Sequence, residues 1–272
     1  MKRIGLLGCG AIGTQIALAI DSGRIPATLT HVYDIEQSHA ENLVSKLKQK
    51  PEVVTNSHLL SSNSVELVVE AASQDAVRND AVSILQNKKD MMIMSAGALL
   101  DESDFEVISD ACRDFGKTVY LPSGAIAGLD ALKAVRDELE STVLVTTKNP
   151  NSLKGAPFFD SSDIDPEKIS ESTVLFDGTA KDAVSLFPKN VNVSALLSLV
   201  GLGGDNTSVR IVADPNTDKN IHEISANGKF GNMKIIVENV PDSMNPKTSR
   251  LATLSAVELL RQICTKEVQI GT

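Results

Sequence analysis

The feature that most limits the fold of this chain is a glycine pattern near its N-terminus, in "RIGLLGCGAIG". A short apolar run ends at Gly8, and Gly10 and Gly13 complete a G-x-G-x-x-G spacing as a helical stretch begins. In such a strand-to-helix turn, the N–H groups around Ala11 and Ile12 and the helix dipole bind the pyrophosphate of a dinucleotide. The motif therefore predicts a dinucleotide site, although a glycine-rich turn in an unrelated α/β domain carries the same letters.

A carboxylate at the end of the next predicted strand, "THVYD", strengthens this interpretation. Asp34 follows the glycine motif by about 20 residues, where an acidic side chain accepts hydrogen bonds from the adenine-ribose hydroxyls. The same charge repels a 2′-phosphate. The sequence therefore favours NAD over NADP as the cofactor, and use of both stays open.

The first 120 residues alternate short apolar runs with amphipathic stretches, the pattern of a doubly wound, Rossmann-type parallel sheet with crossover helices. Small residues follow two of the later strands, in "VEAAS" and "SAGAL". Ala72, Ser73, Ser95 and Gly97 would leave room for the cofactor at the carboxyl edge of the sheet. Tight packing of strand on helix explains small residues there equally well.

After Gly124 the pattern changes to that of a second α/β domain with a mixed or antiparallel sheet. Its strand-like segments are "STVLVTTKNP", "STVLFDG" and "TSVRIVADP", and its helices are expected near "TAKDAVSLF" and "VNVSALLSLVGLG". A hairpin is expected from "NIHEIS" and "NMKIIVENV", with Asn227-Gly228 as a favoured turn dipeptide.

The last predicted helix, "NPKTSRLATLSAVELLRQI", has apolar residues at helical spacing, and Asn245 and Pro246 suit its first turn. The helix is long enough to return to the first domain. We therefore expect a dinucleotide-binding domain of residues 1–124 plus 245–272, with residues 125–244 inserted as the second domain.

Charge and cysteine content exclude several classes of protein. The formal net charge of −9 argues against a nucleic-acid partner, which normally requires a basic surface. No uncharged apolar run reaches the roughly 18 residues of a membrane span, so we expect a soluble protein without a membrane partner. Cys9, Cys112 and Cys264 are odd in number and scattered, which predicts neither disulfides nor a metal site and is typical of the cytoplasm.

Two candidate sites lie in the second half of the chain. His222 is the only histidine of the second domain, and an imidazole with a pKa near neutrality suits proton transfer. Strand alternation places His222 on the same side as Ile224, where a packed, hydrogen-bonded histidine is also expected. In "NPKTS", the helix start with Lys247, Thr248 and Ser249 would make a carboxylate receptor, and an ordinary helix cap is the alternative.

The segments "LLGCGAIG", "SAGAL", "PSGAIAGLDAL", "FPKNVNVSA", "IHEISANGKFG" and "NPKTSRLATLSA" resemble, in order and spacing, the L-aspartate dehydrogenase family along essentially the whole chain. The resemblance implies NAD(P)-dependent oxidation of L-aspartate to iminoaspartate. This product hydrolyses to oxaloacetate and ammonia, or a quinolinate-forming enzyme captures it for NAD biosynthesis. The resemblance also implies a homodimer, in which the second domain binds substrate and mediates the dimer contacts.

The same resemblance assigns individual residues. It matches His222 to the family's active-site histidine, and it adds as cofactor contacts Ala125 and an asparagine of "KNVNV", where Asn192 fits better than Asn190. Two other enzymes share the expected two-domain plan, a dihydrodipicolinate reductase and a homoserine dehydrogenase. A non-catalytic NAD-binding sensor is an alternative from a different class.

Overall fold

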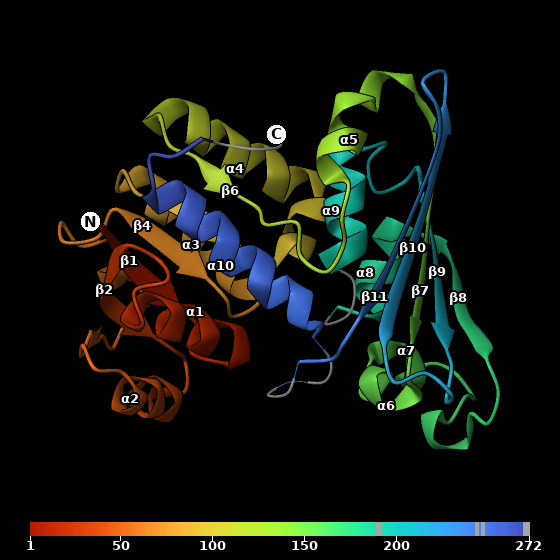
Figure 1. The fold of residues 1–272 in the computed structure, drawn as a ribbon, viewed down its shortest axis with the longest axis horizontal. Coiled ribbons are helices and arrows are strands. Elements are labelled where there is room, and N and C mark those ends of the chain that lie inside the picture. The colour runs from red at the N-terminus through yellow and green to blue at the C-terminus, as the bar shows by residue number, and fades with distance from the viewer. Residues whose placement is uncertain (189–191, 243–244, 246–247, 269–272) are drawn as a thin grey trace. The chain divides into compact units, whose positions relative to one another are not determined.

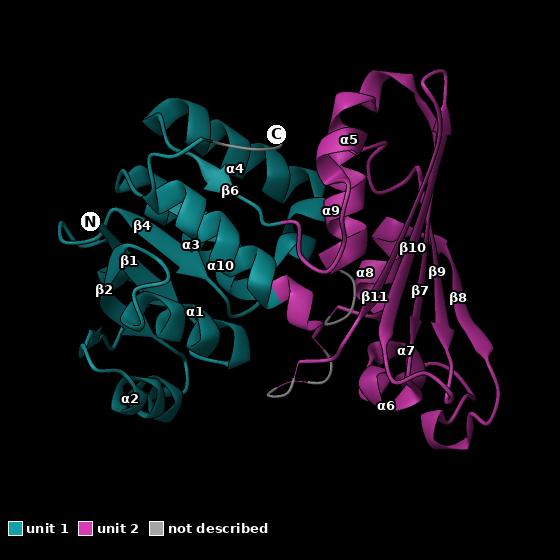
Figure 2. Cartoon of the chain, in the orientation of Figure 1, with its two compact units in different colours: residues 1–122, 253–270 teal, residues 123–252, 271–272 magenta. Residues whose placement is uncertain are grey.

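The chain divides into two compact units (Figure 2). The computed structural model describes residues 1–188, 192–242, 245 and 248–268. Unit 1 comprises residues 1–122 and the C-terminal segment from Thr253, and unit 2 comprises residues 123–252. The second boundary between the units lies after residue 252, later in the chain than the expected boundary at residue 245. The reason is that the chain before the last helix folds back on unit 2. Ser249 forms a β-bridge with Pro241 there.

Unit 1 contains a six-stranded sheet in the order β3-β2-β1-β4-β5-β6, with every pair parallel. The strands are β1 (Lys2–Leu7), β2 (Ala27–Tyr33), β3 (Glu52–Val53), β4 (Leu67–Glu70), β5 (Asp90–Ile93) and β6 (Val119–Tyr120). The helices are α1 (Ala11–Asp21), α2 (Gln37–Lys46), α3 (Gln74–Gln86) and α4 (Glu102–Phe115), with the 3-10 helices η1 (Ser57–Ser61) and η2 (Ala96–Leu100). The expected doubly wound parallel sheet is confirmed, and its strand order changes direction between β1 and β4, where such sheets bind ligands.

The end of the chain contributes to the core of unit 1. Ile4 and Leu6 of β1 and Ile16 of α1 are fully buried, and Ala256 and Leu260 of α10 (Arg250–Cys264) belong to the same cluster (Figure 1). The central strands are covered on both faces, so they are nearly continuous apolar runs in the sequence. This is why β1 and β4 could be recognised without their neighbours.

Unit 2 contains a five-stranded mixed sheet in the order β11-β10-β7-β9-β8. The strands are β7 (Leu139–Lys148), β8 (Thr173–Thr179), β9 (Thr207–Ala213), β10 (Asn220–Gly228) and β11 (Gly231–Asn239). The helices are α5 (Leu129–Ala134), α6 (Pro150–Leu153), α7 (Pro157–Asp160), α8 (Ala180–Leu186) and α9 (Asn192–Val200), with the 3-10 helices η3 (Arg136–Glu138) and η4 (Pro166–Lys168). Only β7 and β9 are parallel, so the expected mixed sheet is confirmed.

The two faces of the second sheet differ in burial. Thr142, Leu144, Thr146 and Lys148 of β7 are buried, while the residues between them are partly exposed. Helices α5, α8 and α9 lie over the buried face (Figure 1). Side chains on one strand alternate between faces, so β10 buries Asn220, His222, Ile224 and Ala226 on this same covered side.

The expected hairpin is present, but the expected turn is wrong. Gly228 pairs with Gly231, so the turn consists of Lys229 and Phe230, and Asn227-Gly228 ends β10. The structure requires a glycine at Gly228 for a different reason. A Cβ atom there would lie 1.9 Å from the carbonyl oxygen of Glu138.

The expected start of the last helix is also wrong. The helix begins at Arg250, and Asn245 lies in the turn before it. The backbone N–H of Thr248 donates to the carbonyl of Asn245, and the carbonyl of Thr248 accepts from the N–H of Asp242. Pro246 and Lys247 lie outside the described residues. A capping signal in the sequence did not reveal this turn, because turns and helix starts favour the same residue types.

Candidate active site

The glycine motif in unit 1 forms a tight turn between β1 and α1. Gly8 has a φ of 99°, and a Cβ atom on it would lie 2.6 Å from the carbonyl oxygen of Ala71, next to the end of β4. A Cβ atom on Gly13 would lie 2.0 Å from the carbonyl oxygen of Gly8. By contrast, a Cβ atom on Gly10 would meet nothing within 4 Å. Two glycines therefore allow close packing, and the third borders open space.

The start of α1 faces this open space. Gly10 is the N-cap of α1 and has no side chain that could bind the first-turn N–H groups, which include those of Ala11 and Ile12. Unpaired N–H groups and the positive end of the helix dipole attract an anion. The turn therefore fits a phosphate group that approaches over Gly10.

Asp34 joins the end of β2 to the glycine turn. Its Oδ2 accepts the N–H of Cys9 at 2.7 Å, and its Oδ1 accepts the N–H of Glu36 at 3.0 Å. Burial, and secondarily the negative charge of Asp34, raises the pKa of the Cys9 thiol to about 12. Cys9 is therefore a protonated, packed residue of the turn, and the carboxylate of Asp34 holds the turn against β2.

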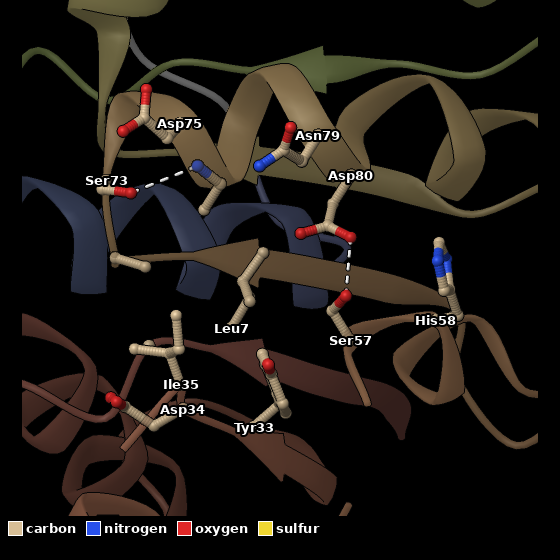
Figure 3. A pocket seen from close by; sticks show the side chains of 13 residues that line it. Leu7, Tyr33, Asp34, Ile35, Ser57, His58, Ser73, Asp75, Asn79 and Asp80 are labelled. Carbon is tan, nitrogen blue, oxygen red and sulfur yellow. Dashed lines mark hydrogen bonds between the residues drawn. The ribbon is translucent and has the colours of Figure 1, made fainter. Parts of the chain in front are cut away.

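A cavity of about 410 Å³ opens beside the turn (Figure 3). Residues of four segments line it: Leu7, Gly8, Tyr33, Asp34, Ile35, Ser57, His58, Ala72, Ser73, Asp75, Ala76, Asn79 and Asp80. The hydroxyl of Ser57 donates to Asp80 at 2.7 Å across one wall. Ser73 caps α3, because its hydroxyl accepts the N–H of Ala76 at 3.1 Å. The predicted cofactor residues Gly8, Asp34, Ala72 and Ser73 thus share one cavity.

A buried carboxylate fixes the neighbouring loops. Glu70, at the end of β4, is 0% exposed and accepts the backbone N–H groups of Ala72, Met94 and Ser95 and the hydroxyl of Ser95. Burial raises the pKa of Glu70, and these hydrogen bonds oppose that shift. Ser95 and Gly97, the other predicted cofactor residues of unit 1, are both buried. Glu70 therefore determines the positions of the loops that follow β4 and β5.

The predicted residues of unit 1 fit a dinucleotide, as judged from the turn itself. The free helix start and the space over Gly10 fit a pyrophosphate, and the carboxylate of Asp34 borders the adjoining cavity. The side chain of Asp34 also has accepting capacity beyond its two backbone bonds, because a carboxylate can accept about four hydrogen bonds.

In unit 2, His222 lies in the middle of a sheet. It is 1% exposed, and its Nδ1 lies 3.0 Å from Oγ1 of Thr146, which is its register partner on β7. When Nδ1–H donates to this hydroxyl, Nε2 carries the lone pair that can accept a proton. The contact therefore fixes the orientation of the imidazole ring.

Lys148 is the second buried base of this region. It is 3% exposed, and burial lowers the pKa of its ammonium to about 8. Burial, together with the positive charge of Lys148, lowers the pKa of His222 to about 3. His222 is consequently neutral near pH 7, the form that can act as a base.

The remaining predicted residues of unit 2 lie in three places. The side-chain amide of Asn220 donates to Oγ of Ser249 at 3.3 Å, which brings the predicted substrate residue Ser249 to the strand of His222. The carbonyl of Ala125 accepts a hydrogen bond from the side chain of Asn239 at 2.9 Å. Asn192 is the first residue of α9.

Two of the predicted positions have no structural description, since Asn190 and Lys247 lie outside the described residues. Thr248, by contrast, lies in the turn before α10, and its hydroxyl accepts a hydrogen bond from the side-chain amide of Asn245 at 3.2 Å.

Three residues beside His222 were not anticipated from the sequence: Thr146, Lys148 and Asn220. The segment "VTTK" reads as half of a strand, and nothing in it indicates its partner. Register links Thr146 to His222 across 76 residues, so only the pairing of β7 with β10 reveals the group. The sequence held one signal of this group: strand alternation predicts that Lys148 is buried, and a lysine is seldom buried without a functional reason.

Among the residues that the structure describes, no three His, Cys, Asp or Glu side chains gather as ligands of a metal ion. Within the same residues, none of the helices has both the length and the apolar character that crossing a membrane requires.

A parallel sheet with a glycine turn that fits a dinucleotide, joined to a second unit with a buried histidine, defines a nicotinamide-dependent oxidoreductase with separate cofactor and substrate units. Comparison with known families agrees. Residues 8–122 match the model described as "Homoserine dehydrogenase, NAD binding domain", and residues 130–263 match "Aspartate dehydrogenase, C-terminal".

The chain belongs to the aspartate dehydrogenase family. It is 66% identical to an L-aspartate dehydrogenase of Nitrosopumilus maritimus and 47% identical to one of Methanocella arvoryzae, in each case over 100% of both chains. The resemblance proposed from the sequence is thereby confirmed.

Solved structures show the same fold. The aspartate dehydrogenase of Thermotoga maritima matches with a TM-score of 0.76 and 27% identity, covering 99% of each chain. A homoserine dehydrogenase of Thiobacillus denitrificans has a TM-score of 0.60 over 96% of this chain and 74% of its own, but at 12% identity it shares only the fold.

Proposed function

We propose that this protein is an NAD-dependent L-aspartate dehydrogenase that oxidises the α-carbon of L-aspartate to iminoaspartate. The observation that carries the proposal is the full-length identity of 66% to a relative of that name. The buried imidazole of His222, held by Thr146 on a sheet separate from the dinucleotide turn, supplies a base for such a reaction. A homoserine dehydrogenase is the second candidate, because its NAD-binding model matches unit 1.

His222 is proposed to accept a proton from the substrate ammonium. The α-carbon can release a hydride only when the nitrogen has a free electron pair, so this proton must leave first. The low pKa of His222, about 3, belongs to a buried ring beside a positive charge. A dicarboxylate that enters next to the ring brings negative charge and raises this pKa toward neutrality. In the reverse direction the same nitrogen returns the proton.

The residues of unit 1 are proposed to bind the cofactor. The N–H groups at the start of α1 and the space over Gly10 would hold the pyrophosphate, and Asp34 would bind the adenine ribose. The positions Ala72, Ser73, Ser95 and Gly97 would border the rest of the molecule, with Ala125 and Asn192 added by family resemblance. When bound, NAD supplies the hydride acceptor. The protein supplies orientation and the proton acceptor.

The first experiment compares substrates and removes the imidazole. NADH formation from L-aspartate, L-homoserine and other amino acids is measured at alkaline pH for the wild-type protein and for His222→Asn. We expect turnover of aspartate by the wild type and a loss of roughly 100- to 10,000-fold in kcat for the variant, with an unchanged Kd for NADH. Turnover of homoserine in place of aspartate would reject the proposal. NADH binding without turnover of any amino acid would indicate a sensor.

We further propose that NAD is preferred over NADP because the carboxylate of Asp34 repels a 2′-phosphate. Asp34→Ser should lower the ratio of kcat/KM for NAD to that for NADP by roughly 10- to 100-fold, since one charge-assisted contact is lost and one repulsion is removed. Glu36→Gln is the control, because it removes an exposed charge two residues away. An unchanged ratio in Asp34→Ser would show that the choice of coenzyme lies elsewhere.

Three further proposals complete this function. The protein forms a homodimer through the uncovered face of the second sheet. Its iminoaspartate either hydrolyses to oxaloacetate and ammonia or passes to a quinolinate-forming enzyme. It acts in the cytoplasm, in agreement with its scattered, unpaired cysteines.

A further inference from the structure

The covered face of the second sheet changes character along its strands. Toward the hairpin turn Leu144 of β7 and Ile224 and Ala226 of β10 are almost fully buried, and Thr142 is the buried polar residue of these strands there. Toward the other end of the same strands the face is polar, and the side chains there are equally buried. Thr146, Lys148, Asn220, His222 and Asn239 are each exposed by 4% or less.

The strand register brings these five polar residues together. His222 is paired with Thr146, and Ile221 is paired with Thr147, so Asn220 and Lys148 occupy the next step along the two strands. Asn220 is also paired with Asn239 of β11. Burying so many polar groups costs free energy unless they find partners, and such groupings usually mark function.

One atom in this group lacks a partner. Asn220 is 1% exposed, and its Oδ1 accepts no hydrogen bond in the described part of the chain, while its Nδ2 donates to Ser249. A buried amide oxygen left in this way costs about 1–3 kcal/mol. A ligand with an N–H group, such as an ammonium, would satisfy it.

The charges of the group point to the rest of the ligand. Lys148 and His222 are both bases, and the positive charge of the Lys148 ammonium contributes to the lowered pKa of His222. The buried carboxylate in the loop after β11, Asp242, accepts the backbone N–H of Asn245. A buried ammonium attracts an anion strongly, because water does not screen it.

We propose that Lys148 and Asn220 are substrate-binding residues of the His222 site, in which the Lys148 ammonium binds a carboxylate and Asn220 Oδ1 accepts the amino group of a small dicarboxylic amino acid. This inference rests on the proposed function. It assigns a donor, an acceptor and a base to three adjacent positions of one sheet face. Burial lowers the pKa of His222 most, and a carboxylate bound to Lys148 would offset the smaller part of this shift that comes from the Lys148 charge.

The test uses the full-length protein and variants that lose the ammonium. Lys148→Met keeps much of the side-chain length, and its thermal unfolding is measured first, so that only folded protein enters the comparison. We expect KM for L-aspartate to rise by roughly 30- to 100-fold, the effect of losing one charged hydrogen bond. We also expect the preference for L-aspartate over its neutral isostere L-asparagine to fall by a similar factor. The methionine at position 148 would no longer distinguish the side-chain carboxylate of aspartate from the amide of asparagine.

Binding is measured as well as turnover. Isothermal titration with L-aspartate, without cofactor, should show weaker binding to Lys148→Met and to Asn220→Leu, while the Kd for NADH stays at the wild-type value. Lys181→Met is the matched control, because Lys181 is an exposed lysine of α8 that forms an ion pair with Asp205. This control should behave as the wild type does in both assays.

The outcomes separate this inference from the proposed function. A wild-type protein that does not oxidise L-aspartate rejects the proposed function. The inference alone is rejected if the wild type oxidises L-aspartate and the folded Lys148→Met variant keeps both the wild-type KM for aspartate and the wild-type preference for aspartate over asparagine. If Lys148→Met does not fold, Lys148→Gln replaces it in the same comparison, because its amide keeps a polar group in the buried position.

Discussion

The chemistry of His222 depends on its burial. A solvent-exposed histidine is half protonated near pH 6.5, but burial and the charge of Lys148 lower the pKa of this ring to about 3. The folded protein thus holds His222 neutral across the physiological range. A neutral His222 ring can accept a proton from a substrate. The same low pKa makes the folded protein less stable in acid.

The effect of acid on stability follows from the direction of this shift. Between pH 6.5 and about 3 the unfolded chain binds a proton at His222 that the folded chain does not bind. The free energy of unfolding therefore falls as the pH drops below 6.5, by up to about 1.4 kcal/mol per pH unit from this group. Below about pH 3 both states are protonated and the effect stops growing.

A comparison with His222→Asn isolates this contribution. Urea unfolding at pH 7 and pH 5 should show that the wild type loses about 2 kcal/mol more than the variant between the two values. All other titrating groups are common to both proteins, so they cancel in the difference. Equal losses would mean that the ring is hydrated or paired with an anion in the folded state.

A residue could be placed in the fold from the sequence where it belongs to a local pattern. Gly8, Gly13 and Asp34 were identified because a turn, a helix start and a strand end lie within one short stretch. Lys148 and Asn220 were missed, since their neighbours on the sheet come from distant parts of the chain. Long-range strand register is not encoded in any short window of sequence.

At the level of elements, Gly10 and Gly13 of the β1–α1 turn are glycines for different reasons. Gly13 needs its missing side chain for packing, because a Cβ atom would lie 2.0 Å from the carbonyl oxygen of Gly8. Gly10 has room for a methyl group and an ordinary φ of −69°. The methyl group would occupy the space that a pyrophosphate requires.

We therefore expect opposite results from two alanine variants. Gly13→Ala should lower the melting temperature by several degrees, because the backbone must shift to avoid the contact. Gly10→Ala should keep the wild-type melting temperature, yet weaken NADH binding by roughly 10-fold or more. Thermal unfolding and NADH fluorescence titration of both variants provide the measurements. Wild-type NADH affinity in Gly10→Ala would place the phosphates elsewhere.

Elements were predicted well where periodicity decides them and less well at their ends. The long strands and the body of α10 follow from apolar spacing, whereas β3 is two residues long and gave no signal. The hairpin turn was placed on Asn227-Gly228 because that dipeptide favours turns, but tertiary contact with Glu138 required the glycine. The start of α10 was placed early because the turn before it contains the same capping residues.

The whole molecule presents one surface whose composition indicates a partner. On the face of the second sheet opposite to the helices, every strand carries a partly or largely exposed apolar side chain: Val143, Val145, Val174, Val212, Ile221 and Ile236. Val174 on β8 and Ile236 on β11 are each 53% exposed. The ion pairs Arg210–Asp177 and Lys234–Glu223 lie on the same face, so its composition is the mixed apolar and polar one of many protein interfaces.

A second copy of the chain is the proposed occupant, because identical sheet faces can pack about a twofold axis. Ile236→Glu should then weaken the dimer by roughly 100-fold or more, since each interface would bury two uncompensated charges. Val107→Glu is a matched control, because Val107 on α4 of unit 1 is also 53% exposed. Sedimentation velocity at several protein concentrations should show twice the chain mass for the wild type and Val107→Glu, and the mass of one chain for dilute Ile236→Glu. A dimer of unchanged affinity in Ile236→Glu would exclude the β11 side of this face from the interface, because burying the new charge there would weaken association.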